Sequence, residues 1–373
     1  MQYRTLGRTG LKVSALGFGG MRFLMKDGHV DEEVALAALH RAMDLGVNYF
    51  DSAVGYCNGE SEATIGKALR GRREGMVVST KYPPWPPRTK TADDCRAIIE
   101  QSLNRFQVDH IDVYHMHSLD WNAAQEVLKP GMAVDGARKA KEEGLVKHLA
   151  FSFHDDPRRM IDIIEAAPDF EVVTCQYNLL DRANEESMAY AHEHGLGVVV
   201  MGPVAGGRLG FPSERLQGVL PGTVKSTPEL ALRFVLANPH VSVALSGMNT
   251  VAMVEENAAV ASNEQPLSER ERERILEMLA ENQRLADLYC TGCGYCMPCP
   301  NGVNIPECFR LMNLHRVYGL TFAAREQYRG FGDEGNKNAA ACVECGQCEP
   351  KCPQKIPIIE QLKETHAALG ESK

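Results

Sequence analysis

Four types of ionisable side chain in the first third of the chain can together move a proton. Asp51 and Lys81 each end a short apolar run, Tyr56 lies five residues after Asp51, and another run ends with His115 and His117. A neighbouring ammonium group lowers the pKa of a tyrosine, whose ordinary value is about 10. A carboxylate beside that ammonium group keeps it charged when both are buried. The set predicts a tyrosine general acid, with a histidine that donates to a carbonyl oxygen.

The cysteines indicate a second kind of chemistry. Only three of the 12 precede residue 290, and the other nine lie within 290–352. Thiolates at this density suit iron-sulfur clusters or zinc, and the second run has the C-x2-C-x2-C-x3-C-P spacing of bacterial ferredoxins. That spacing favours iron-sulfur clusters, because zinc ribbons use separated cysteine pairs. The candidate ligands are Cys290, Cys293, Cys296 and Cys299 in the first run, and Cys342, Cys345, Cys348 and Cys352 in the second.

The tail resembles a two-cluster ferredoxin, which implies two [4Fe-4S] clusters. In such ferredoxins the fourth cysteine of each run ligates the other cluster. The resemblance therefore implies that Cys352 completes the first run and Cys299 the second. The first run has two residues rather than three before its Cys-Pro, so this partition and a single cluster both stay open. Cys308 is a spare that substitutes for a ligand or packs.

Apolar runs alternate with longer amphipathic stretches as far as residue 261, after a predicted hairpin over 2–14. Strict alternation of strands and helices implies a parallel sheet, and eight units fit a closed (β/α)8 TIM barrel. The alternative is an open doubly wound sheet, whose G-x-G-x-x-G turn is missing at 17–21. One long helix is expected over 123–143. The predicted strands are 16–20, 47–51, 76–81, 110–117, 146–152, 171–176, 197–201 and 241–246.

In such a barrel the chemistry collects at the carboxyl ends of the strands. Asp51, Lys81 and the pair His115 and His117 occupy predicted strand ends, so the fold brings them to one rim. The cysteine-rich tail is expected to form a mostly helical, ferredoxin-like domain of its own. The predicted domains are 1–285 for the barrel and 286–373 for the iron-sulfur domain.

Composition excludes several classes of partner. The chain has 40 Lys and Arg against 49 Asp and Glu, a formal net charge of -9, which argues against binding nucleic acid. No apolar run approaches the roughly 18 residues needed to span a bilayer, and the first residues lack the pattern of a signal peptide. We expect a cytoplasmic protein that contacts no membrane.

The residues around the four ionisable side chains resemble the aldo-keto reductase family. The resemblance covers about residues 1–285 and implies a (β/α)8 barrel that reduces carbonyls with a nicotinamide cofactor. It implies a catalytic tetrad of Asp51, Tyr56, Lys81 and His117, and leaves His115 as a histidine that either packs in the core or supports the tetrad from behind. The matching stretches are Phe50-Asp51-Ser52-Ala53-x-x-Tyr56, Ser79-Thr80-Lys81 and Asp109-His110-Ile111-Asp112-Val113-Tyr114-x-x-His117.

The cofactor half resembles the family less closely. Met201 stands where relatives often stack a tyrosine on the nicotinamide, and the family's Asn after Ser152 is absent. Gly247 and Met253 stand where many members hold the 2'-phosphate with cations, so NADP(H) is the implied cofactor and NAD(H) stays open. Arg208 is expected to meet the pyrophosphate. The implied cofactor-binding residues are Gly20, Met21, Ser152, Gln176, Met201, Gly202, Met248, Glu256 and Asn257.

The implied activity is reduction of a small aldehyde or ketone to an alcohol, with clusters that carry electrons or stabilise the fold. Hydride moves two electrons and a cluster moves one, so the two halves do not couple directly. One alternative is a ferredoxin-linked or flavin-dependent enzyme on the same barrel. Another is a redox-sensing regulatory subunit with little turnover. The expected partners are a carbonyl compound and an electron-transfer protein. Loops that carry Trp85 and Trp121 are expected to line the pocket for the carbonyl compound.

Overall fold

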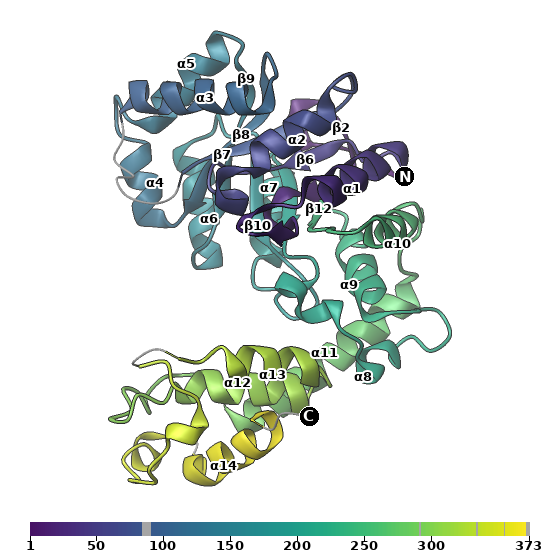
Figure 1. Ribbon diagram of the computed structural model, residues 1–373. Coiled ribbons are helices and arrows are strands. Elements are labelled where there is room, and N and C mark those ends of the chain that lie inside the picture. Colours follow the sequence, from purple (N-terminus) through teal and green to yellow (C-terminus); the bar gives the residue numbers. More distant parts are fainter. Residues whose placement is uncertain (84–90, 291, 333–334, 354, 371–373) are drawn as a thin grey trace. The chain divides into compact units, whose positions relative to one another are not determined.

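The computed structural model describes residues 1–83, 91–290, 292–332, 335–353 and 355–370 (Figure 1). By their contacts they form two compact units. The first joins Met1–Gly206 to Ala231–Leu267, and the second joins Gly207–Leu230 to Ser268–Lys373. The domain boundary predicted at residue 285 stays a prediction, because these units group residues by contact and not along the chain.

Eight parallel strands close into a barrel in the first unit, in the order β10-β11-β12-β3-β6-β7-β8-β9. This confirms the predicted (β/α)8 fold. The strands are buried along most of their length, as expected where helices cover the outer face and side chains fill the inside. They are β3 (Leu16–Gly19), β6 (Tyr49–Asp51), β7 (Val77–Tyr82), β8 (Ile111–Leu119), β9 (Val146–Phe153), β10 (Val172–Gln176), β11 (Gly197–Met201) and β12 (Val243–Ser246).

Helices follow the strands around the barrel, with one departure from the prediction. The single helix expected over 123–143 is two helices, α4 and α5, because Pro130 cannot continue a helix and Gly131 takes a left-handed conformation with φ +79°. The helices are α1 (Glu32–Asp44), α2 (Ser61–Leu69), α3 (Ala92–Phe106), α4 (Trp121–Val127), α5 (Ala133–Glu142), α6 (Pro157–Ala166), α7 (Glu185–Glu193), α9 (Thr227–Leu236) and α10 (Val251–Ala261).

The predicted hairpin closes the amino end of the barrel. Strands β1 (Tyr3–Thr5) and β2 (Lys12–Ser14) pair antiparallel, and Leu6 and Val13 are fully buried in one cluster with barrel residues. That cluster contains Tyr49, Val77, Val113, Ala150, Val172, Val199, Val243 and Leu245, drawn from seven of the eight strands. The layer fixes the strands at one end and leaves the carboxyl rim for polar side chains.

The second unit is mostly helical, as predicted for the tail. Helix α12 packs on α13 and α14, and its inward side buries Phe309, Leu311 and Met312. Among the described residues, none of the helices has the length and apolarity that crossing a membrane requires. The helices are α8 (Glu214–Gln217), α11 (Glu269–Tyr289), α12 (Ile305–Arg316), α13 (Thr321–Arg329) and α14 (Ile358–Leu369).

Candidate functional site

Asp51 and Lys81 lie together at the carboxyl ends of the neighbouring strands β6 and β7. Lys81 Nζ donates to Asp51 Oδ2 at 2.5 Å and to the carbonyl oxygen of Ser52 at 2.6 Å. The Lys81 side chain is 3% exposed and that of Asp51 is 5% exposed. Burial disfavours the charged lysine, but Asp51 and Tyr56 outweigh burial and hold the pKa of Lys81 above its ordinary value. The pair therefore keeps an ammonium group inside the rim.

Tyr56 stands beside this pair, as predicted. Its ring centroid is 4.9 Å from Lys81 Nζ, and the His117 ring meets it edge-on at 5.9 Å between centroids. Tyr56 begins the short helical segment η3 (Tyr56–Gly59), in which Cys57 and Asn58 take left-handed conformations with φ 52° and 57°. This tight turn between β6 and α2 returns the tyrosine to the end of its own strand. The structure thus brings all four predicted tetrad residues together.

The electrostatic balance at Tyr56 differs from the prediction. Burial raises the pKa of Tyr56 and Asp51 raises it further, whereas the charge and hydrogen bond of Lys81 lower it. The net direction is upward, opposite to that expected from Lys81 alone. Desolvation of the phenolate therefore exceeds the attraction of the ammonium group. In this state Tyr56 holds a proton available for donation at neutral pH.

The two histidines of β8 take different positions. His117 lies at the rim against Tyr56, whereas His115 is fully buried between the barrel strands, as expected for a packed histidine. Of the predicted substrate wall, Trp85 lies outside the described residues. Trp121 begins α4, and the Arg159 guanidinium lies 5.8 Å from its ring centroid. The tryptophan therefore presents a face that also attracts a cation.

The residues expected at the nicotinamide lie on three strand ends of the same rim. Gln176 and Met201 pair in register at the ends of β10 and β11. A Cβ atom on Gly202, which has φ +64°, would lie 2.7 Å from Gln176 Oε1, so only glycine lets the amide occupy this position. Ser152 Oγ, on β9, accepts from the Ser118 backbone N–H at 2.7 Å. Gln176 is therefore fixed against the backbone, while the hydroxyl oxygen of Ser152 already has one donor.

The residues of the first βα turn and those expected at the adenosine differ in how far they are exposed. Gly20 is buried and Met21 is 53% exposed after β3. Met248 is buried, the Glu256 side chain is exposed, and Asn257 Nδ2 donates to Ser246 Oγ at 3.1 Å. Asn257 therefore fixes the end of β12, and Met248 packs. These two residues are not free to contact a ligand with their whole side chains.

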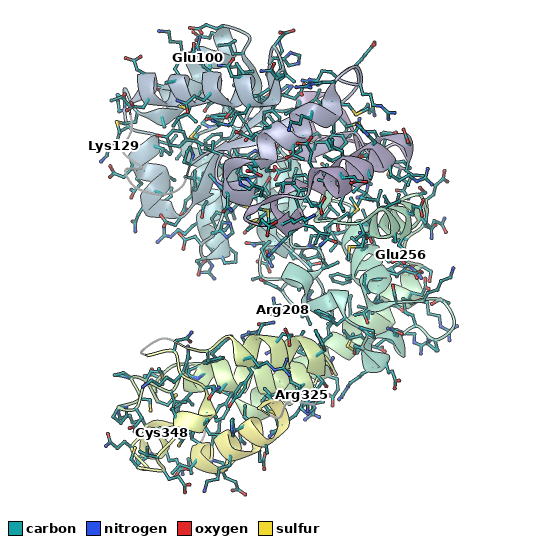
Figure 2. All side chains as sticks on the ribbon, in the orientation of Figure 1. Glu100, Lys129, Arg208, Glu256, Arg325 and Cys348 are labelled. Atoms are coloured by element: carbon teal, nitrogen blue, oxygen red, sulfur yellow. The ribbon has the colours of Figure 1, made fainter. Side chains whose placement is uncertain are left out.

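Arg22 is a candidate that the sequence analysis missed. Its side chain occupies the space beside Gly247, where an added Cβ atom would lie 2.8 Å from Arg22 Cγ. Gly247 is a position at which the family resemblance implies a cation, and here a cation from the first βα turn lies against it. No local pattern in the sequence links Gly247 to Arg22, because the two residues lie far apart along the chain. Figure 2 labels Arg208, the other candidate cation, in the segment η4 (Ala205–Gly210).

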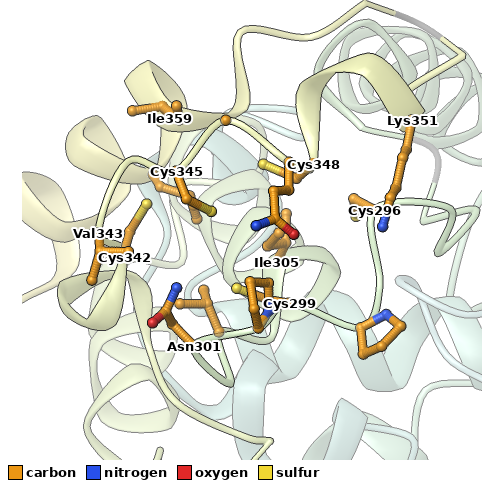
Figure 3. A pocket seen from close by; sticks show the side chains of 16 residues that line it. Cys296, Cys299, Asn301, Ile305, Cys342, Val343, Cys345, Cys348, Lys351 and Ile359 are labelled. Atoms are coloured by element: carbon orange, nitrogen blue, oxygen red, sulfur yellow. The ribbon is translucent and has the colours of Figure 1, made fainter.

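The cysteines of the tail line two pockets, and each pocket takes ligands from both runs. Figure 3 shows the larger one, of about 390 Å³ including open space. The larger pocket is lined by Cys299, Cys342, Cys345 and Cys348. The smaller pocket is lined by Cys290, Cys293 and Cys352. Cys296 borders both pockets.

The donor set of each pocket fits an iron-sulfur cluster. The smaller pocket has four thiols and the larger has four besides Cys296, and four thiols are the ligands that a [4Fe-4S] cluster requires. Cys308 is fully buried and lines neither pocket, and burial raises its pKa to about 12, so it packs in the core.

Comparison with known proteins defines the class to which this barrel and its cysteine-rich tail belong. The chain belongs to the aldo/keto reductase family, whose model matches residues 15–280, and a 4Fe-4S dicluster domain matches residues 289–356. It is therefore an oxidoreductase of the aldo-keto reductase type that carries a carboxyl-terminal iron-sulfur domain.

Individual relatives match the barrel part of the chain. The chain is 30% identical over 291 residues to an L-galactose dehydrogenase of Arabidopsis thaliana, covering 70% of this chain and 88% of the relative. It is 25% identical over 334 residues to an L-glyceraldehyde 3-phosphate reductase of Escherichia coli, covering 76% and 94%. Among solved structures, the holo form of aldo-keto reductase AKR11C1 from Bacillus halodurans has a TM-score of 0.64 at 30% identity, covering 74% of this chain and 96% of that one.

Proposed function

We propose that the protein reduces a small aldehyde or ketone to an alcohol with NADPH. The observation that carries the proposal is the position of Tyr56 between the buried Lys81–Asp51 pair and His117. When bound, the nicotinamide supplies a hydride. Tyr56 donates its phenol proton to the carbonyl oxygen as that oxygen becomes an alkoxide, and His117 orients the oxygen with a hydrogen bond. The relative from Escherichia coli that is named L-glyceraldehyde 3-phosphate reductase supports this reaction.

The rim offers a consistent set of contacts for the cofactor. In this proposal Gln176 holds the nicotinamide carboxamide, because its amide is already fixed against Gly202. Met201 provides an apolar, polarisable contact in the place of an aromatic ring. Arg22 supplies the cation for the 2'-phosphate beside Gly247.

A first prediction concerns nucleotide choice. One charge-assisted hydrogen bond from Arg22 should give NADPH an advantage of about tenfold over NADH, or about 1.4 kcal/mol. Arg22→Ala should remove that advantage and leave NADH affinity unchanged. Gln176→Ala serves as the matched control, since loss of a nicotinamide contact should weaken both nucleotides alike. Fluorescence titration of each nucleotide against the three proteins measures the ratios, and an NADPH advantage that Arg22→Ala retains contradicts the role of Arg22.

A second prediction concerns pH. The pKa of Tyr56 is raised, so the phenol keeps its proton below that value and loses it only as the pH rises through it. The rate of the reduction step should therefore be nearly constant from about pH 7 to about pH 9, below the ordinary tyrosine pKa of about 10. Single-turnover reduction under anoxia measures this step. A decline with an apparent pKa below about 8 would show that another group donates the proton.

The proposal assigns two [4Fe-4S] clusters to the tail, one in each cysteine pocket. Cys293 and Cys345 are exposed, and nearby Tyr295 and Val343 are 67% and 63% exposed. Exposed apolar side chains beside the ligands suit the brief docking of an electron-transfer protein. Electrons then pass singly between the clusters and that carrier, separately from hydride transfer on the barrel.

A further inference from the structure

A chain of hydrogen bonds runs behind the Lys81–Asp51 pair and ends on a histidine that the proposed reaction does not use. Asp51 Oδ1, the oxygen that Lys81 leaves free, accepts from Ser79 Oγ at 2.8 Å. The same hydroxyl lies 3.4 Å from His115 Nδ1, and His115 Nε2 lies 2.8 Å from Thr174 Oγ1. All of these side chains are buried. The chain connects four groups of the barrel interior to the ammonium group beside Tyr56.

The chemistry of the groups fixes the direction of each hydrogen bond. A carboxylate only accepts, so Ser79 must give its single hydrogen to Asp51. The hydrogen between Ser79 and His115 must then come from His115 Nδ1. His115 Nε2 is left to accept from the Thr174 hydroxyl, which is the arrangement of a neutral imidazole. The hydrogen bonds thus run in one direction, from Thr174 through His115 and Ser79 to Asp51. The Thr80 backbone also contacts His115, and the Tyr49 hydroxyl also faces Ser79.

The surroundings of His115 oppose its protonation. Burial lowers the pKa of His115 far below its ordinary value. Lys81 and His117 lower this pKa further, and a hydrogen bond with the Thr80 backbone raises it only in part. The other ionisable group in this series of hydrogen bonds is Asp51, which faces His115 only through Ser79. His115 therefore stays neutral and keeps the same hydrogen on Nδ1 over the pH range in which an enzyme works.

The barrel makes room for this contact. His115 on β8 pairs in register with Ala150 on β9, and Thr174 lies one strand further, on β10. Because Ala150 is small, the imidazole can extend across β9 to the threonine. The link therefore ties together strands that are not neighbours, and it does so at the level of the tetrad.

We propose that His115 is a positioning residue, which holds the Ser79 hydroxyl on Asp51 and thereby sets the strength of Tyr56 as an acid. The inference rests on the proposed function, since it concerns the proton that Tyr56 donates. Without His115 the Ser79 hydroxyl can turn from Asp51 toward the neighbouring Tyr49 hydroxyl. The negative charge of Asp51 is then less compensated, and the phenol of Tyr56 becomes a weaker acid.

The test compares two substitutions of His115. Glutamine can present one N–H to Ser79 and one carbonyl oxygen to Thr174, whereas leucine can present neither. His115→Leu should lower kcat for carbonyl reduction about tenfold, the effect of one lost hydrogen bond to a charged group, with KM for the carbonyl nearly unchanged. It should also move the apparent pKa of alcohol oxidation upward. His115→Gln should restore both values to within about threefold of wild type.

Two controls separate this role from stability and from the proposed function. Val243→Ala, in the buried layer but on β12, should lower the Tm without changing the pH profile. If His115→Leu behaves like Val243→Ala, the histidine is structural and the inference is overturned. If wild type reduces no carbonyl compound, or if Tyr56→Phe has no effect, the proposed function itself fails. Full turnover by His115→Leu alongside an inactive Tyr56→Phe overturns only the inference about His115.

Discussion

Tyr56→Phe should lower carbonyl turnover by about 100-fold or more, the usual scale of general acid catalysis. The substitution removes the phenol hydroxyl and leaves the ring between Lys81 and His117. The alkoxide then keeps the hydrogen bond from His117 but has no phenol to protonate it. Oxidation of NADPH by a panel of aldehydes and ketones under anoxia measures the loss, and nucleotide titration should show unchanged binding.

Tyr114→Phe is the matched control for this experiment. Tyr114 is also fully buried, but its hydroxyl lies near Cys95 of α3 and away from the tetrad. The control should keep turnover within about threefold of wild type. A core substitution that removes no catalytic group changes the free energy of unfolding far more than the rate of the reaction. If Tyr56→Phe matches Tyr114→Phe with every carbonyl tested, another group protonates the product.

The barrel could be predicted because its strands are covered on both faces. The sequence Gly197-Val-Val-Val-Met201, for example, has no polar residue to point at solvent, which is typical of a parallel sheet between two layers. When turns and helices separate such strands, only a few sheet topologies remain possible. Pro130 and Gly131 could have divided the helix over 123–143 by the same local reasoning.

The electrostatics of the tetrad could not be predicted in the same way. The types Asp51, Lys81 and Tyr56 indicate an acid with a tuned pKa, and the structure brings them together. The direction of the pKa shift depends on how deeply the phenol is buried and on its distance from each charge. Those quantities come from the tight turn at Cys57 and Asn58, whose left-handed conformations have no glycine to signal them.

Contacts between distant segments are the other part that sequence reasoning missed. Arg22 meets Gly247 only because β3 and β12 are neighbours in the closed barrel. The segment 207–230, which follows β11, groups with the tail in the same way. Within that unit Ser213 Oγ donates to the Tyr318 carbonyl oxygen at 2.7 Å. No periodicity or spacing along the chain marks such a pair.

The cysteine runs should hold about eight iron and about eight acid-labile sulfide per chain when the protein is purified under anoxia. When Cys296, which borders both pockets, is assigned to the smaller one with Cys290 and Cys293, each pocket takes three ligands from one run and the fourth from the other. Double substitutions can test this partition. Cys290→Ser with Cys352→Ser removes two ligands of one pocket and should leave about four iron.

Cys342→Ser with Cys352→Ser removes two ligands of one run but one from each pocket, and should leave little or no iron. Clusters formed run by run would reverse these two results, because the second pair would then damage a single cluster. Cys308→Ser is the control and should retain about eight iron, since Cys308 is buried in the core and lines neither pocket. Zinc without sulfide in the wild-type protein would exclude iron-sulfur clusters, and about four iron in wild type would reduce the two sites to one occupied cluster.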